Sequence, residues 1–130
     1  MSKEKIKELT KAEEQIMQIL WQLGKGFVKE IVEKMDEPKP AYNTVSTIVR
    51  ILETKGFIDH QAFGKTHEYF PLISKEEYKK SFLKNFVHNY FGSSYKQLVS
   101  FFSKEEHIDL KELEDLKSLL EEEINKQKNA

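Results

Sequence analysis

The sequence contains no cysteine, which excludes disulfide bonds, zinc–thiolate sites and thiol catalysis. It has only five glycines and three prolines, and they form neither a phosphate-binding loop nor a nucleophile elbow. No apolar run is long enough for a signal peptide or a membrane span, so we expect a cytoplasmic protein without membrane insertion. No set of residues typical of catalysis is present, and we predict neither an enzyme nor a bound cofactor.

Metal binding is not predicted either. The four histidines are His60, His67, His88 and His107, and none lies at metal-ligand spacing from another ligand on one helix. His60 and His67 could face each other across a hairpin, but two separate surface histidines are the preferred interpretation.

The charge of the chain is close to neutral. A net charge of −1 over 130 residues argues mildly against nucleic-acid binding, because domains that bind phosphates usually carry a basic excess. Between Lys39 and His67, however, four basic residues stand against two acidic ones. This local basic excess permits DNA binding without proving it.

Residues 42–55 have the pattern of an amphipathic helix. Val45, Ile48, Val49 and Leu52 recur at the spacing of one apolar helix face. The opposite face carries short polar side chains and one arginine, a combination that suits base edges and phosphates in a major groove. An ordinary solvent-exposed helix is the alternative for this segment alone. The polar face consists of Asn43, Ser46, Thr47, Arg50 and Thr54.

The neighbouring segments predict a winged helix-turn-helix. A short helix is expected over residues 29–35, and Pro38 and Pro40 break it before residue 42. Residues 57–63 and 66–72 are rich in aromatic and β-branched residues and flank Gly64, which predicts a β-hairpin wing.

The C-terminal half predicts three more helices, over about residues 74–91, 95–102 and 109–124. They carry more large apolar side chains than three short helices can bury among themselves, which indicates a partner, most simply a second copy of the chain. A monomeric three-helix pack is the alternative. The residues expected in the dimer contact are Tyr78, Phe82, Phe86, Tyr90, Leu98, Phe101, Phe102, Leu113, Leu116 and Leu120.

The predicted fold is mainly α with a small β-hairpin wing. A winged helix-turn-helix DNA-binding domain covers residues 1–72, and a helical dimerisation domain covers residues 73–130. A winged helix that serves only as a protein-interaction adaptor is the alternative function, favoured by the near-neutral charge. The residues expected to contact DNA are Lys39 and Tyr42 at phosphates, Asn43, Thr44, Ser46, Thr47 and Arg50 on the recognition helix, and Lys65 at the wing tip.

A set of ordered motifs resembles the penicillinase repressor family (the BlaI/MecI/CopY group). The most distinctive are Leu9-Thr-Lys-Ala-Glu13, Tyr42-Asn-Thr-Val-Ser-Thr47 and Leu52-Glu-Thr-Lys-Gly56. The similarity continues through residues 64–69, 98–106 and 112–116, and covers about residues 9–124. Their order and spacing together are specific, although no single motif is diagnostic.

The resemblance implies a homodimeric repressor that binds a palindromic operator, with the two recognition helices reading half-sites about one helical turn apart. In the β-lactam branch of the family, a membrane sensor protease triggers cleavage at a bond that corresponds to Phe101–Phe102 here. The family has Asn before this bond, where this chain has Phe101. Two core or interface phenylalanines are the alternative reading of the pair. The copper branch uses a cysteine cluster, which this chain lacks.

Overall fold

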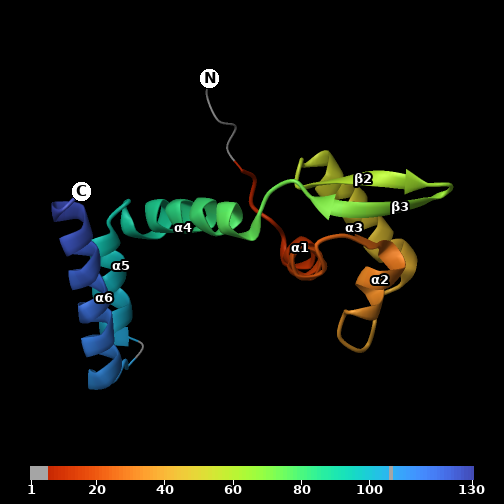
Figure 1. Ribbon diagram of the computed structural model, residues 1–130. Helices are drawn as coiled ribbons and strands as arrows, with labels where there is room; N and C mark the ends of the chain where they lie inside the picture. The colour runs from red at the N-terminus through yellow and green to blue at the C-terminus, as the bar shows by residue number, and fades with distance from the viewer. Residues whose placement is uncertain (1–5, 106) are drawn as a thin grey trace. The chain divides into compact units, whose positions relative to one another are not determined.

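The computed structural model describes residues 6–105 and 107–130, which form six α-helices and three β-strands (Figure 1). The chain divides into two compact units, the first ending at Leu83 and the second beginning at Lys84. The division falls within helix α4 (Lys75–Phe91).

Helix α1 (Lys11–Leu23) begins and ends at the predicted local signals. The hydroxyl of Thr10 accepts the backbone N–H of Glu13 at 3.2 Å, and the carboxylate of Glu13 accepts the backbone N–H of Thr10 at 2.9 Å. This reciprocal capping box satisfies two donors that the first turn leaves free. Gly24 ends the helix with a φ of 82°, a left-handed conformation that favours glycine.

Two helices follow and form the predicted helix-turn-helix. α2 (Val28–Glu33) begins one residue earlier and ends two residues earlier than the sequence predicted. The loop with Pro38 and Pro40 separates it from α3 (Tyr42–Thr54), which begins at the predicted residue. Gly56, with a φ of 84°, lets the chain turn from α3 into the wing.

The wing belongs to a small antiparallel sheet with the strand order β1-β3-β2. β2 (Ile58–Phe63) and β3 (Thr66–Pro71) form the predicted hairpin, closed by the Phe63–Thr66 pair around a two-residue turn. The third strand, β1 (Gly26–Phe27), pairs with β3 and was not predicted as part of a sheet. It connects the wing to the start of α2.

The core of the first unit lies between α1, α2, α3 and the sheet, and the end of the unit contributes Tyr78. The Tyr78 side chain is only 7% exposed. Its ring packs edge-on against Phe57, and its hydroxyl accepts the backbone N–H of Leu9 at 3.0 Å. The structure thus makes Tyr78 a core residue of the first unit, which corrects its predicted place in a dimer contact. Burial raises the pKa of its phenol, a smaller opposing effect coming from the Leu9 hydrogen bond.

The segment after the wing is tied to α1 by the single tryptophan. The indole N–H of Trp21 donates to the carbonyl of Ile73 at 2.9 Å, and its ring lies 6.0 Å from that of Tyr78. Ser74 and Glu77 then form the second predicted capping box, at 2.9 and 3.0 Å, and start α4.

The second unit buries little of its apolar surface. It contains the end of α4, α5 (Tyr95–Glu105) and α6 (Leu110–Lys128), which is capped by Asp109 as predicted. Val87 is the only buried residue among positions 84–105 and 107–130. Within the described ranges, no helix has the length and apolar character needed to cross a bilayer. Large apolar side chains exposed in this unit are Tyr90, Tyr95, Val99, Phe101, Leu110, Leu113, Leu119, Leu120 and Ile124.

Candidate nucleic-acid interface

Helix α3 has one buried apolar face and one exposed polar face. Val45, Val49 and Leu52 are completely buried, so this side of the helix lies against the core. A helix held in this way projects its other face away from the domain, as required of a helix that enters a major groove. The predicted residues Tyr42, Asn43, Thr44, Thr47 and Arg50 are exposed, and Ser46 is half-buried.

Two threonine hydroxyls on the exposed face are oriented by the helix itself. Thr47 Oγ1 donates to the carbonyl of Asn43 at 2.9 Å, and Thr54 Oγ1 donates to the carbonyl of Arg50 at 3.0 Å. Because the proton of each hydroxyl is used inside the helix, its lone pairs remain as acceptors and its methyl group is fixed in direction. Thr47 can therefore accept from a base amino group or contact a thymine methyl.

A groove of about 410 Å³ runs between the start of α2, helix α3 and the wing. Tyr42, Ser46 and Arg50, spaced by four residues, line it from α3. The fold thus brings the predicted residue Lys65 of the wing tip to the same groove as these three helix residues. The remaining lining residues, which were not predicted from the sequence, are Phe27, Val28, Lys29, Glu30, Thr66, His67 and Tyr69.

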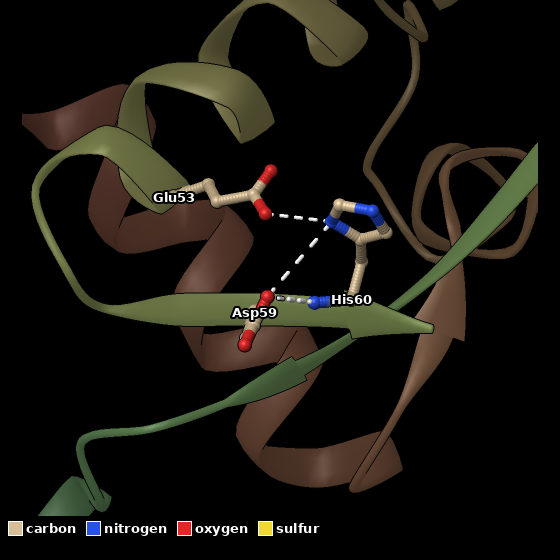
Figure 2. Close-up of side chains that lie close together, drawn as sticks. All are labelled: Glu53, Asp59 and His60. Carbon is tan, nitrogen blue, oxygen red and sulfur yellow. Dashed lines mark hydrogen bonds and ion pairs between the residues drawn. The ribbon is translucent and has the colours of Figure 1, made fainter. Parts of the chain in front are cut away.

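The wing is held to the recognition helix by a side-chain contact at its base. Glu53 Oε2 of α3 lies 2.6 Å from Nδ1 of His60 on β2 (Figure 2). Asp59 supports the same strand by accepting the backbone N–H of His60 at 2.8 Å. This contact fixes the start of β2 relative to the end of α3, and so limits how far the wing can move from the helix.

The two wing histidines are stacked. The rings of His60 and His67 are 4.0 Å apart and 7° from parallel, which corrects the preferred interpretation of two separate surface histidines. The stack connects His67, which lines the groove, to the Glu53–His60 contact.

Glu53, Asp59 and His60 could be considered as metal ligands, because one ligand atom from each lies within 4.8 Å of the others. The 2.6 Å separation of Glu53 Oε2 and His60 Nδ1 is that of a hydrogen bond, however. Two ligands that share one cation at about 2.0–2.2 Å lie about 3 Å or more apart. We therefore interpret the cluster as a tie between helix and wing.

Two lysines near α3 are engaged within the protein. The ammonium of Lys39 donates to the carbonyls of Glu33 and Met35 at 3.0 and 2.6 Å, and so caps the end of α2. This corrects its predicted role at a phosphate, because its donors point into the protein. Lys55 lies 2.6 Å from the carboxylate of Glu13. Thr44 does not reach the groove of Arg50; it lines a separate one beside Pro38 and Pro40.

The residues predicted for the dimer contact differ in exposure. Tyr90, Phe101, Leu113 and Leu120 of the second unit are exposed, whereas the other second-unit members are half-buried. Phe82 is exposed and belongs to the first unit. The Phe101–Phe102 bond lies inside α5, and the ring of Phe101 is 5.6 Å from that of Phe91. The half-buried members are Phe86, Leu98, Phe102 and Leu116.

Comparison with known proteins agrees with this architecture. The methicillin resistance regulatory protein MecI of Staphylococcus aureus is 28% identical over 114 residues, which cover 87% of this chain and 93% of that protein. The penicillinase repressor of Bacillus licheniformis is 22% identical over 125 residues, covering 95% and 98% of the two chains.

The fold of the first unit is also found in a solved structure. The solution structure of the DNA binding domain of the repressor BlaI is similar with a TM-score of 0.50 and 23% identity. The match covers 58% of this chain and 94% of that one. Residues 9–122 match the family described as penicillinase repressor. The chain therefore belongs to the penicillinase repressor family.

Proposed function

We propose that this protein is a homodimeric winged-helix repressor that binds a palindromic operator and blocks transcription. It belongs to a family of transcriptional repressors, which are not enzymes. The observation that carries the proposal is the exposed polar face of α3 beside a groove that also contains a cation of the wing tip. Such a repressor would act on DNA in the cytoplasm.

The residues of this interface would make two kinds of contact with DNA, to bases and to the backbone. Asn43, Ser46 and Thr47 present short donors and acceptors to base edges, while Arg50 can reach a guanine or a phosphate. Tyr42 and Lys65 flank them and contact the backbone, which sets the register but carries no sequence information. Because these contacts are few, one protomer alone binds weakly, and specificity depends on two copies acting together.

Dimerisation is assigned to the helical segment after the wing, with residues up to 72 assigned to DNA binding. The apolar residues exposed along α6 and α5 form a surface that a second copy would cover. The most direct candidates on α6 are Leu113, Leu120 and Ile124, which recur at helical spacing. Any change that separates the two copies would release the operator.

Two routes of release fit this segment: proteolysis, or another change in the dimer contact. A membrane sensor protease acting on Phe101–Phe102 would first need α5 to open locally, because the bond lies within a helix. The simpler role for Phe101 and Phe102 is packing, either within the second unit or in its dimer contact.

The test of the proposal is an electrophoretic shift with a duplex from the promoter of the protein's own gene. We expect a discrete complex at submicromolar protein that an unrelated duplex of equal length competes for at least about 1,000-fold more weakly. A winged helix that acts only as a protein-interaction adaptor would give no sequence-dependent shift at low micromolar protein.

Two substitutions should separate base contacts from phosphate contacts. Thr47→Ala removes an acceptor on the recognition helix, so it should change the preferred sequence at one position of each half-site by about 1–3 kcal/mol. Lys65→Ala should instead weaken binding to all sequences and reduce the salt dependence by about one unit of slope per protomer. Binding measured at 50–200 mM KCl to operator variants checks both. An affinity of the unsubstituted protein that does not change with salt would contradict the phosphate contacts.

A further inference from the structure

The groove between α2, α3 and the wing gathers more positive charge than the recognition helix has alone. Lys29 contributes from the start of α2, Arg50 from α3 and Lys65 from the wing tip. The one carboxylate in its lining, that of Glu30, accepts the backbone N–H of Phe27 at 2.9 Å. The groove therefore carries a net positive charge on a chain whose total charge is −1.

These three cations are free of ion pairs, unlike other basic residues of the same unit. Within residues 6–105 and 107–130, neither Lys29, Arg50 nor Lys65 lies within 4.0 Å of a carboxylate. Lys25 and Lys55, by contrast, pair with Glu68 and Glu13. The groove cations are thus available to an external anion without first breaking an internal contact.

Two other residues that line the groove, Tyr69 and His67, add no negative charge to it. Tyr69, at the floor, is buried, and this burial is the main cause that raises the pKa of its phenol; Glu53 raises it further and Arg50 opposes the rise. Its hydroxyl therefore stays neutral. His67 lines the wall and is held by its stack on His60, and an imidazole N–H can donate to a phosphate oxygen.

We propose that this groove holds a phosphate group of the DNA backbone, and that Lys29 and His67 are DNA-contacting residues together with Arg50 and Lys65. The inference rests on the proposed function and adds residues to it. DNA is the expected source of the phosphate because Ser46 and Arg50 belong both to the groove and to the polar face of α3. A strand whose bases meet α3 would carry its phosphates across the groove.

This assignment accounts for DNA binding by a protein of near-neutral charge. Each protomer has three unpaired cations in its groove, so a dimer would bring six cations to the DNA backbone. At about 0.9 counterions released per phosphate contact, the logarithm of affinity should fall with the logarithm of salt with a slope of about −5. The acidic residues that balance the chain, such as those at positions 121–123, lie outside the groove.

Lys29→Ala in the full chain tests the inference. Fluorescence anisotropy with an unrelated 30-bp duplex at 50–200 mM KCl measures the contact without knowledge of the operator. The salt slope should fall in magnitude by about 0.9 for each protomer, and the affinity at 0.1 M should fall by about ten-fold per protomer. His67→Ala should lower the affinity by a smaller factor than Lys29→Ala, because it removes a hydrogen-bond donor and no lysine charge.

Lys34→Ala is the matched control. It removes the same charge at the other end of α2, from a residue that lies outside this groove, and should leave the slope unchanged. A Lys29→Ala slope equal to that of the unsubstituted protein would overturn the groove assignment. Because Lys29 is exposed and alanine favours helices, loss of folding is not expected, and circular dichroism checks it.

Three further outcomes are informative. If inorganic phosphate, exchanged for chloride at equal ionic strength, binds to the unsubstituted protein but not to Lys29→Ala and leaves the affinity for DNA unchanged, the groove is a site for a small anion and the DNA assignment is overturned. A promoter duplex that binds no better than the unrelated one would refute the proposed function, whatever the slopes. Absence of binding to either duplex would refute both.

Discussion

Leu120→Glu is expected to convert the protein to a monomer and to lower its operator affinity by at least about 100-fold. Leu120 is 55% exposed in α6, on the side of the helix that also presents Leu113 and Ile124. A two-fold contact uses the same surface of both copies, so one substitution places two carboxylates in it. Each would lose its hydration without gaining a partner, which costs several kcal/mol.

The loss of affinity follows from the loss of the second recognition helix. The affinity of two linked half-site contacts exceeds the affinity of either one alone by a factor of about 10²–10⁴, because the second contact forms at a high effective concentration. A monomer would retain only one set of base contacts and the phosphate contacts of one groove. Analytical ultracentrifugation measures the oligomeric state, and anisotropy with the promoter duplex measures the affinity.

Ser118→Glu provides the matched control for this change. Ser118 is exposed on the same helix, about 200° around the axis from Leu120 at 100° per residue. It gains the same charge away from the apolar side, so the dimer and the affinity should persist. Because Leu120 is not part of a buried core, its substitution should leave the helix content unchanged. A Leu120→Glu protein that remains dimeric would show that another surface joins the copies.

Much of the first unit could be predicted from the sequence, because the patterns that determine its helices and its hairpin are local. The apolar spacing of Val45, Val49 and Leu52 and the glycine in the two-residue turn of the wing each act within a few residues. A helix or hairpin with such signals forms in the same place in many tertiary surroundings. The two-residue strand β1 carried no such pattern, since its only ladder partner lies some 40 residues away on β3.

The errors concern side chains whose partners could not be identified from the spacing of residues in the sequence. Tyr78 shares its four-residue spacing with Phe82, but the first turn of α4 lies against Phe57 and Leu9 of the first unit. Lys39 has the charge expected of a phosphate contact, yet its ammonium reaches back to the end of α2. Lys29 became a groove residue only because β1 and the wing position the start of α2 beside α3.

Glu13→Ala is expected to lower the free energy of unfolding by about 3 kcal/mol at pH 7, since it breaks a largely buried ion pair and a cap together. Glu13 is the one buried charged residue among those described, with a side chain only 6% exposed. It accepts from Lys55 Nζ at 2.6 Å and from the backbone N–H of Thr10 at 2.9 Å. The pair joins the start of α1 to the residue that ends the recognition helix.

Urea denaturation followed by circular dichroism measures this loss. Glu14→Ala is the control, because it removes the neighbouring carboxylate of the same turn and should cost less than about 1 kcal/mol. Lys55→Met should be as destabilising as Glu13→Ala, since it leaves the carboxylate buried without a cation. If the two contacts are coupled, the double variant Glu13→Ala/Lys55→Met should lose clearly less than the sum of the single losses.

The same pair gives stability a definite pH dependence. Burial acts to raise the pKa of Glu13, but the hydrogen bonds from Lys55 and Thr10 and the charge of Lys55 outweigh it and lower the pKa below its usual value. A carboxyl whose pKa is lowered by folding contributes its full stabilisation above its unfolded pKa, near 4.5, and loses it as the pH falls through the folded value. The difference in unfolding free energy between the unsubstituted protein and Glu13→Gln should therefore be constant from pH 8 to 6 and shrink below about pH 4.5. A difference that did not change down to pH 3 would mean that the Glu13 contribution comes from packing and the cap, without its charge.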